Sequence, residues 1–122
     1  MTNLNVKDVK PFVPAKDFEE SLRFYTGLGW KLNWRDEGLA ELELGGHRFY
    51  LQNYYNRDWA ENWMLFVAVE DADSWYARAK EVVEAFEGTR VTPAKQEEYG
   101  ARVTYVWDPS GVLIHFAQFI DS

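Results

Sequence analysis

Hydrophobic and polar residues at the start of the chain alternate, and then recur at helical spacing. The alternation runs over Val6–Val13, and two prolines near its end predict a short strand at a sheet edge. Asp17, with Glu20 three residues later, resembles a capping box and predicts a helix that ends at Gly27 or Gly29. The apolar stripe expected on this helix consists of Phe18, Leu22 and Tyr25.

Three further strands are predicted in the first half of the chain. They are Trp30–Arg35, Leu39–Leu44 and His47–Gln52. Glycine-containing turns separate them, which is typical of two consecutive hairpins. Glu41 and Glu43 alternate with apolar residues along the middle strand, so we expect them on the face that points away from the helix.

The second half of the chain repeats this order. We predict a strand, a helix, the start of a short strand and a closing hairpin at Trp63–Val69, Asp71–Phe86, Val91–Thr92, Arg102–Trp107 and Val112–Phe119. The hairpin turns at Asp108-Pro109-Ser110-Gly111, a strong turn tetrapeptide. The pattern therefore predicts an α+β fold of two tandem β-α-β-β-β modules, about 6–52 and 63–119, in a single domain over residues 1–122.

The amino-acid composition excludes several classes of function and favours others. The 122 residues include 13 Lys and Arg against 20 Asp and Glu, a net charge of −7, which disfavours nucleic acid and favours cationic small molecules as partners. The absence of cysteine excludes disulfides and thiolate chemistry. No apolar run could span a membrane and no signal peptide is recognisable, so we expect a soluble, cytoplasmic protein. Aromatic residues are 17% of the chain, with 6 Trp and 7 Tyr, which predicts a stacking cavity or an aromatic interface.

Four local segments, together with the duplicated order, resemble the vicinal oxygen chelate superfamily, which includes glyoxalase I, extradiol dioxygenases and bleomycin resistance proteins. The segments are Val13–Asp17 leading into Ser21–Tyr25, then Leu28–Trp30, Val67–Asp71, and Trp107–Phe116 with its Asp-Pro-Ser-Gly turn. The resemblance implies a curved mixed sheet that forms a cleft, with the helices outside.

Four strand positions supply the ligands in those superfamily members that bind a metal. By the resemblance these positions fall on Lys10, on Tyr50 or Gln52, on Met64 or Trp63, and on His115. A protonated lysine has no lone pair, a thioether prefers soft metals, and a lone imidazole cannot hold a catalytic divalent ion. We therefore predict no metal, no cofactor and no catalytic residue at this site. Lys10 would suit a cationic ligand poorly unless it pairs with a carboxylate such as Glu43.

The candidate ligand-binding residues are aromatic, acidic or imidazole side chains, because flat rings and carboxylates bind flat, cationic compounds. The aromatic candidates, each of which either lines the cleft or packs the sheet against the helices, are Trp34, Tyr50, Tyr54, Tyr55, Trp59, Trp63 and Trp107. Glu41 and Glu43 face either the cleft or solvent, and Glu98 lies in a loop that either contacts ligand or is simply exposed. His115 faces the cavity if its neighbours in the strand face the core.

A histidine on the last strand without the other metal ligands is most similar to the bleomycin resistance branch. The resemblance implies a metal-independent homodimer that sequesters an aromatic, cationic glycopeptide of the bleomycin type in clefts at the subunit interface. If the dimer is domain-swapped, the candidate arm is Val6–Val13, with Pro14 as its hinge. Two alternatives stay open: a metal-dependent lyase or dioxygenase whose ligands lie elsewhere, and a module that binds another protein through exposed aromatic residues.

Overall fold

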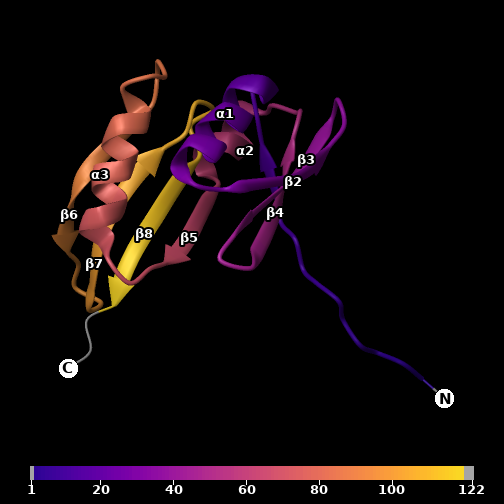
Figure 1. The fold of residues 1–122 in the computed structure, drawn as a ribbon, viewed down its shortest axis with the longest axis horizontal. Coiled ribbons are helices and arrows are strands. Elements are labelled where there is room, and N and C mark those ends of the chain that lie inside the picture. Colours follow the sequence, from indigo (N-terminus) through magenta and orange to yellow (C-terminus); the bar gives the residue numbers. More distant parts are fainter. Residues whose placement is uncertain (1, 120–122) are drawn as a thin grey trace.

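The computed structural model of the protein describes residues 2–119, which form two similar modules (Figure 1). The first module contains β1 (Phe12–Pro14), α1 (Phe18–Leu28), β2 (Lys31–Arg35), β3 (Leu39–Leu44) and β4 (His47–Gln52). Its sheet has the order β1-β4-β3-β2. β1 runs parallel to β4, and the other two pairs are antiparallel.

The second module follows a short helix, α2 (Arg57–Asn62), for which the sequence pattern predicts no helix. It contains β5 (Met64–Ala68), α3 (Ala72–Val83), β6 (Arg90–Gln96), β7 (Ala101–Trp107) and β8 (Leu113–Phe119). The sheet order is β5-β8-β7-β6, again with one parallel and two antiparallel pairs. The α+β class and the tandem β-α-β-β-β modules are thus confirmed.

Local chemistry sets the ends of the helices. The side chains of Asp17 and Asp71 each accept a hydrogen bond from the backbone N–H three residues on, at 3.1 and 3.2 Å. α1 stops at Gly29, whose φ of 128° is open to glycine but not to other residues. The prediction that the second long helix reaches Phe86 is wrong: α3 ends at Val83, because the next amides bond to carbonyls only three residues back and tighten the chain into a turn.

The predicted strand over Val6–Val13 is wrong in its first part. β1 begins only at Phe12, and residues 2–11 form an extended N-terminal arm whose outer part leaves the body of the molecule (Figure 1). The arm side chains of Leu4, Val6 and Val9 are 84%, 75% and 79% exposed. Alternation produces a strand only where a neighbour supplies hydrogen bonds, and within residues 2–119 the pairing with β4 starts at Phe12.

One hydrophobic core spans both modules. Phe24 of α1 contacts Phe86 beyond α3, with ring centroids 5.5 Å apart. Trp75 of α3 stacks on Phe116 of β8 at 4.5 Å. Because α1 and α3 also pack against each other, the helices hold the two sheets in one body.

A buried polar junction fastens α1 to the turn between β7 and β8. The Tyr25 hydroxyl donates a hydrogen bond to Asp108 Oδ2 at 2.7 Å. Asp108 Oδ1 accepts from the N–H groups of Ser110 and Val112, and the Ser110 hydroxyl accepts from the Lys16 N–H. This junction joins the first module to the second.

Each sheet turns one face to the core and the other outward. In β8, Ile114 and Phe116 are buried in the core, so His115 between them lies on the outward face. In β3, Ala40 and Leu42 are buried in the core, which places Glu41 outward. None of the helices within residues 2–119 is long and apolar enough to cross a membrane.

Candidate functional site

The outward face of the first sheet carries a connected polar network. This polar face consists of Lys10, Asn33, Glu41, Glu43, Arg48 and Tyr50. Glu41 is only 8% exposed and accepts hydrogen bonds from Lys10 Nζ at 2.5 Å and Asn33 Nδ2 at 2.9 Å. Lys10 Nζ also donates to the Tyr50 hydroxyl at 3.3 Å and lies 5.0 Å from the centre of the Tyr50 ring.

Lys10 pairs with a carboxylate, and the strand register explains why this is Glu41 and not Glu43. Tyr50 lies opposite Glu41, and it also lies beside Phe12 of β1, so a lysine two residues before Phe12 reaches Glu41. Glu43 lies opposite Arg48 and accepts a hydrogen bond from it at 3.1 Å.

The hydrogen bonds of the polar face keep its groups charged. Those from Lys10 first, and then Asn33, lower the pKa of Glu41. The pKa of Glu43 is also lowered, mainly by its hydrogen bond from Asn33 and then by that from Arg48. The pKa of Lys10 is raised, mainly by its bond to Glu41 and then by its bond to Tyr50. The carboxylates that could receive a cationic ligand are therefore already paired with cations of the chain.

The outward face of the second sheet is aromatic. This aromatic face consists of Phe66, Tyr99, Tyr105, Trp107, His115 and Phe119. Phe66 and Phe119 are 53% and 51% exposed, and their ring centroids are 6.0 Å apart. The His115 ring lies 5.7 Å from Phe66 and 5.0 Å from Tyr105. Such rings offer stacking contacts to a flat ligand.

The surroundings of His115 on this face favour its neutral form. Burial lowers the pKa of its imidazole, and the nearby Glu97 opposes that shift only in part. Its Nε2 lies 3.4 Å from the Met64 sulfur, and within the described part of the chain its buried Nδ1 has no hydrogen-bond partner. A thioether cannot orient an imidazole as a general base, so this arrangement favours packing or ligand contact over catalysis.

Two cations lie over rings of the aromatic face. The Arg90 guanidinium is 3.8 Å from the centre of the Trp107 ring, and Lys95 Nζ is 6.0 Å from that of Tyr105. Burial, followed by a hydrogen bond to Glu97, raises the pKa of Tyr105 to about 12. The rim of the aromatic face therefore carries both signs of charge, since Glu97 lies 3.7 Å from Lys95.

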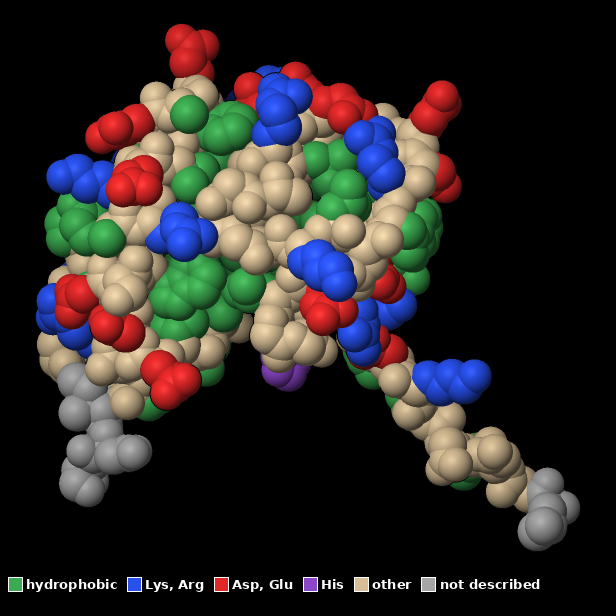
Figure 2. All heavy atoms as spheres, viewed as in Figure 1, with side chains coloured by type: hydrophobic (Ala, Val, Ile, Leu, Met, Phe, Trp, Pro, Cys, Tyr) green, Lys and Arg blue, Asp and Glu red, His purple; other side chains and the backbone are tan. Residues whose placement is uncertain are grey.

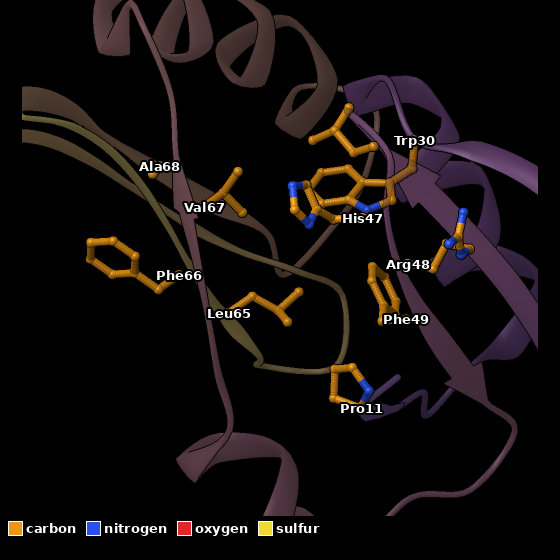
Figure 3. A pocket seen from close by; sticks show the side chains of 10 residues that line it. Pro11, Trp30, His47, Arg48, Phe49, Leu65, Phe66, Val67 and Ala68 are labelled. Atoms are coloured by element: carbon orange, nitrogen blue, oxygen red, sulfur yellow. The ribbon is translucent and has the colours of Figure 1, made fainter. Parts of the chain in front are cut away.

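A cavity of about 370 Å³ lies between the two modules (Figure 3). Its lining is mainly apolar and includes Trp30, Phe49, Leu65 and Val67, with His47 beside them. Figure 2 shows that the molecule is hollowed between its two halves. The sequence-predicted site contains none of the lining residues, because nothing in their alternation distinguishes a cavity wall from the core that it continues.

The structure separates the predicted site residues into groups. Trp34, Glu41, Glu43 and Tyr50 lie together on the first sheet, with Trp34 and Tyr50 rings 6.2 Å apart. Trp107 and His115 lie on the aromatic face of the second sheet.

The remaining predicted residues lie around the connection between the modules or in a turn. Tyr54, Trp59 and Trp63 form a row with centroid distances of 5.8 and 6.1 Å. Tyr55 and Trp63 also pack against the core. Glu98 is exposed in the turn between β6 and β7, where its neighbour Glu97 is the carboxylate near Tyr105.

Comparison with known proteins assigns the family. The model described as the Glyoxalase/Bleomycin resistance protein/Dioxygenase superfamily matches residues 8–116. The chain belongs to this superfamily. A curated relative, the bleomycin resistance protein of Klebsiella pneumoniae, is 26% identical over 112 residues, which cover 88% of this chain and 89% of the relative.

Solved structures of bleomycin-binding proteins share this fold. A bleomycin-binding protein complexed with bleomycin has a TM-score of 0.78 at 23% identity, covering 94% of this chain and 100% of that one. The bleomycin-binding protein from bleomycin-producing Streptomyces verticillus, complexed with copper(II)-bleomycin, has a TM-score of 0.76 at 22% identity, covering 98% and 100%.

The residues that the resemblance gives as metal-ligand positions include side chains that do not suit a divalent catalytic metal. Lys10 and Tyr50 bond to each other in the first module, and Met64 contacts His115 in the second. An ammonium has no lone pair to donate, and a thioether prefers soft ions. Residues 2–119 also contain no cluster of three or more His, Cys, Asp or Glu side chains that could hold a metal.

Proposed function

We propose that the protein binds and sequesters an aromatic, cationic small molecule of the bleomycin type, without metal and without chemical conversion. The observation that carries this proposal is the pair of outward sheet faces, one polar and one aromatic. The similarity to bleomycin-binding proteins supports the choice of ligand. The donor set, which does not suit a catalytic metal, supports binding over catalysis.

We further propose that the protein acts as a homodimer, in which the polar face of one protomer and the aromatic face of its partner line each cleft. β1 and β5 support this, since within residues 2–119 each pairs along one edge only. The exposed residues 2–9 support contact of the N-terminal arm with a partner protomer, while β1 stays paired with β4 of its own chain. Such contact would bury the apolar side chains of Leu4, Val6 and Val9.

Titration of the metal-stripped protein with copper-free bleomycin tests the ligand. We expect a saturable rise in melting temperature and a change in tryptophan fluorescence. Trp34→Ala, which removes a 44% exposed ring, should weaken binding by about 2- to 30-fold, the equivalent of roughly 0.5–2 kcal/mol for one aromatic contact. Leu32→Ala on the same strand is the matched control, because Leu32 lies opposite the core residue Leu42.

A panel of divalent metals completes this experiment. Stabilisation by a metal and not by bleomycin would move the protein to the metal-dependent lyases or dioxygenases of the superfamily. No change in melting temperature with either bleomycin or the metals would favour a module that binds another protein through its aromatic face.

Sedimentation at micromolar concentration tests the dimer. We expect twice the protomer mass for the full chain, and the protomer mass after deletion of residues 2–9. A full-length chain that sediments as a monomer contradicts the proposed interface.

A further inference from the structure

The ammonium of Lys10 lies in a surrounding built for a cation. It contacts the carboxylate of Glu41 at 2.5 Å and the Tyr50 hydroxyl at 3.3 Å, and the Tyr50 ring lies beneath it at 5.0 Å. The second carboxylate oxygen of Glu41 is held by Asn33 at 2.9 Å. A nearly buried carboxylate, a phenol and a ring face are together a strong receptor for a primary ammonium, which can donate to the oxygens and lie over the ring.

Lys10 lies where the exposed N-terminal arm meets the first sheet. Residues 2–9 are exposed, and Asp8 forms an ion pair with Arg48 at 2.7 Å. After Lys10 the chain is fixed, because the Pro11 carbonyl accepts a hydrogen bond from the Tyr50 N–H at 2.9 Å and β1 begins at Phe12. Glu41 and Tyr50 lie opposite each other on paired central strands of the sheet. The receptor therefore lies on paired strands, whereas the lysine within it reaches it on a long side chain from the end of the exposed arm.

We propose that Glu41, Tyr50 and Asn33 form a subsite for a primary ammonium group of the ligand, and that Lys10 occupies it until the ligand displaces it. This inference rests on the proposed function, because it names the ligand group that the polar face receives. Lys10 is then an internal competitor that sets the affinity. By linkage, a ligand that displaces Lys10 also weakens the attachment of the arm to the sheet. Conversely, an interaction that fixes the arm lowers the affinity for the ligand by the same factor.

Amine rescue tests the subsite without any assumption about the natural ligand. Lys10→Ala removes the ammonium and leaves Glu41 and Tyr50 in place. n-Butylammonium chloride should then raise the melting temperature saturably, with an apparent affinity at least about tenfold higher than for the wild type, because a charge-assisted hydrogen bond is regained. Sodium chloride at equal ionic strength, 1-butanol and tetramethylammonium should not reproduce the effect, since none is a cation that can donate to Glu41.

Matched variants identify the residues of the subsite. Lys16→Ala is the control, because Lys16 lies 5.5 Å over the Tyr55 ring and has no carboxylate partner within residues 2–119. Adding Glu41→Gln to Lys10→Ala should abolish the rescue. If Lys10→Ala is poorly folded, Lys10→Met with methylammonium as the probe replaces it. A response of the Lys10 variant no greater than that of Lys16→Ala or of the wild type overturns the proposal.

Competition connects the subsite to the ligand. In Lys10→Ala, n-butylammonium should raise the apparent Kd of copper-free bleomycin at least about threefold, as a competitor present at a few times its own Kd must. An unchanged bleomycin Kd in the presence of saturating amine overturns the assignment of the ligand's ammonium to this subsite. If bleomycin does not bind at all, the proposed function fails, while the amine rescue still decides whether the subsite exists.

Discussion

Asp108 makes the stability of this protein depend on pH in an unusual direction. Its carboxyl is fully buried in the junction between the modules, and burial raises its pKa to about 6 against the hydrogen bonds that lower it, of which the Tyr25 hydroxyl's is the strongest. In the unfolded chain the same group has its ordinary pKa of 3.8. The folded state therefore binds the proton more tightly than the unfolded state.

The sign of the effect follows from linkage. Stabilisation by the bound proton is fully present below pH 3.8 and is lost as the pH rises through about 6. Between pH 4.5 and 7.5 this group alone should lower the free energy of unfolding by about 2 kcal/mol. The direction is opposite to that of an ordinary ion-paired aspartate, which stabilises the folded state at neutral pH.

Asp108→Asn removes this titration while keeping the shape. The amide oxygen can accept from Ser110 and Val112 N–H as Oδ1 does, and the amide nitrogen can donate to the Tyr25 oxygen as a protonated carboxyl would. The variant therefore imitates the protonated protein at every pH. We expect the free energy of unfolding of the variant, minus that of the wild type, to rise by about 2 kcal/mol from pH 4.5 to 7.5.

Urea unfolding followed by tryptophan fluorescence measures this difference at each pH, and the subtraction cancels groups common to both proteins. Asp71→Asn, the same chemical change at an exposed helix cap, is the matched control. A difference for Asp108→Asn that does not change with pH, or that falls as the pH rises, would refute the assignment of a raised pKa to the buried junction.

Further predictions concern stability. Gly29→Ala should destabilise the protein by about 1 kcal/mol or more, because the φ of 128° at Gly29 strains any residue with a side chain. Gly27→Ala, inside α1, should instead stabilise the protein by about 0.5–1 kcal/mol, because alanine has the higher helix propensity. Thermal unfolding of the two variants checks both predictions. Phe116→Ala, at a fully buried ring stacked on Trp75, should cost about 3–5 kcal/mol in urea unfolding, and a loss below 1 kcal/mol would contradict its place in the shared core.

Most of the fold could be predicted from local sequence patterns. The predictions that are wrong concern residues whose structure depends on a partner far away in the sequence. The helix cap at Asp17 depends on a residue three positions away, so the sequence reveals it. Val6–Val13, in contrast, alternates like a strand along its whole length, but it forms a strand only from Phe12 on, where it pairs with β4. The partner of Lys10 likewise depends on the register between β1, β4 and β3, which no local pattern encodes.

Equivalent positions in the two modules carry side chains of different chemical types, and this difference indicates which kind of ligand the two faces would bind. Phe12 pairs with Tyr50 in the first sheet, as Phe66 pairs with His115 in the second, so the two faces are built on the same strand register. Around Tyr50 that register holds an ammonium and a carboxylate, whereas around His115 it holds a thioether and rings. A cleft formed from one face of each kind would match a ligand that is flat and apolar at one end and cationic at the other. The first face adds the rings of Trp34 and Tyr50 to its carboxylates, and the second supplies the exposed rings of Phe66 and Phe119 around His115.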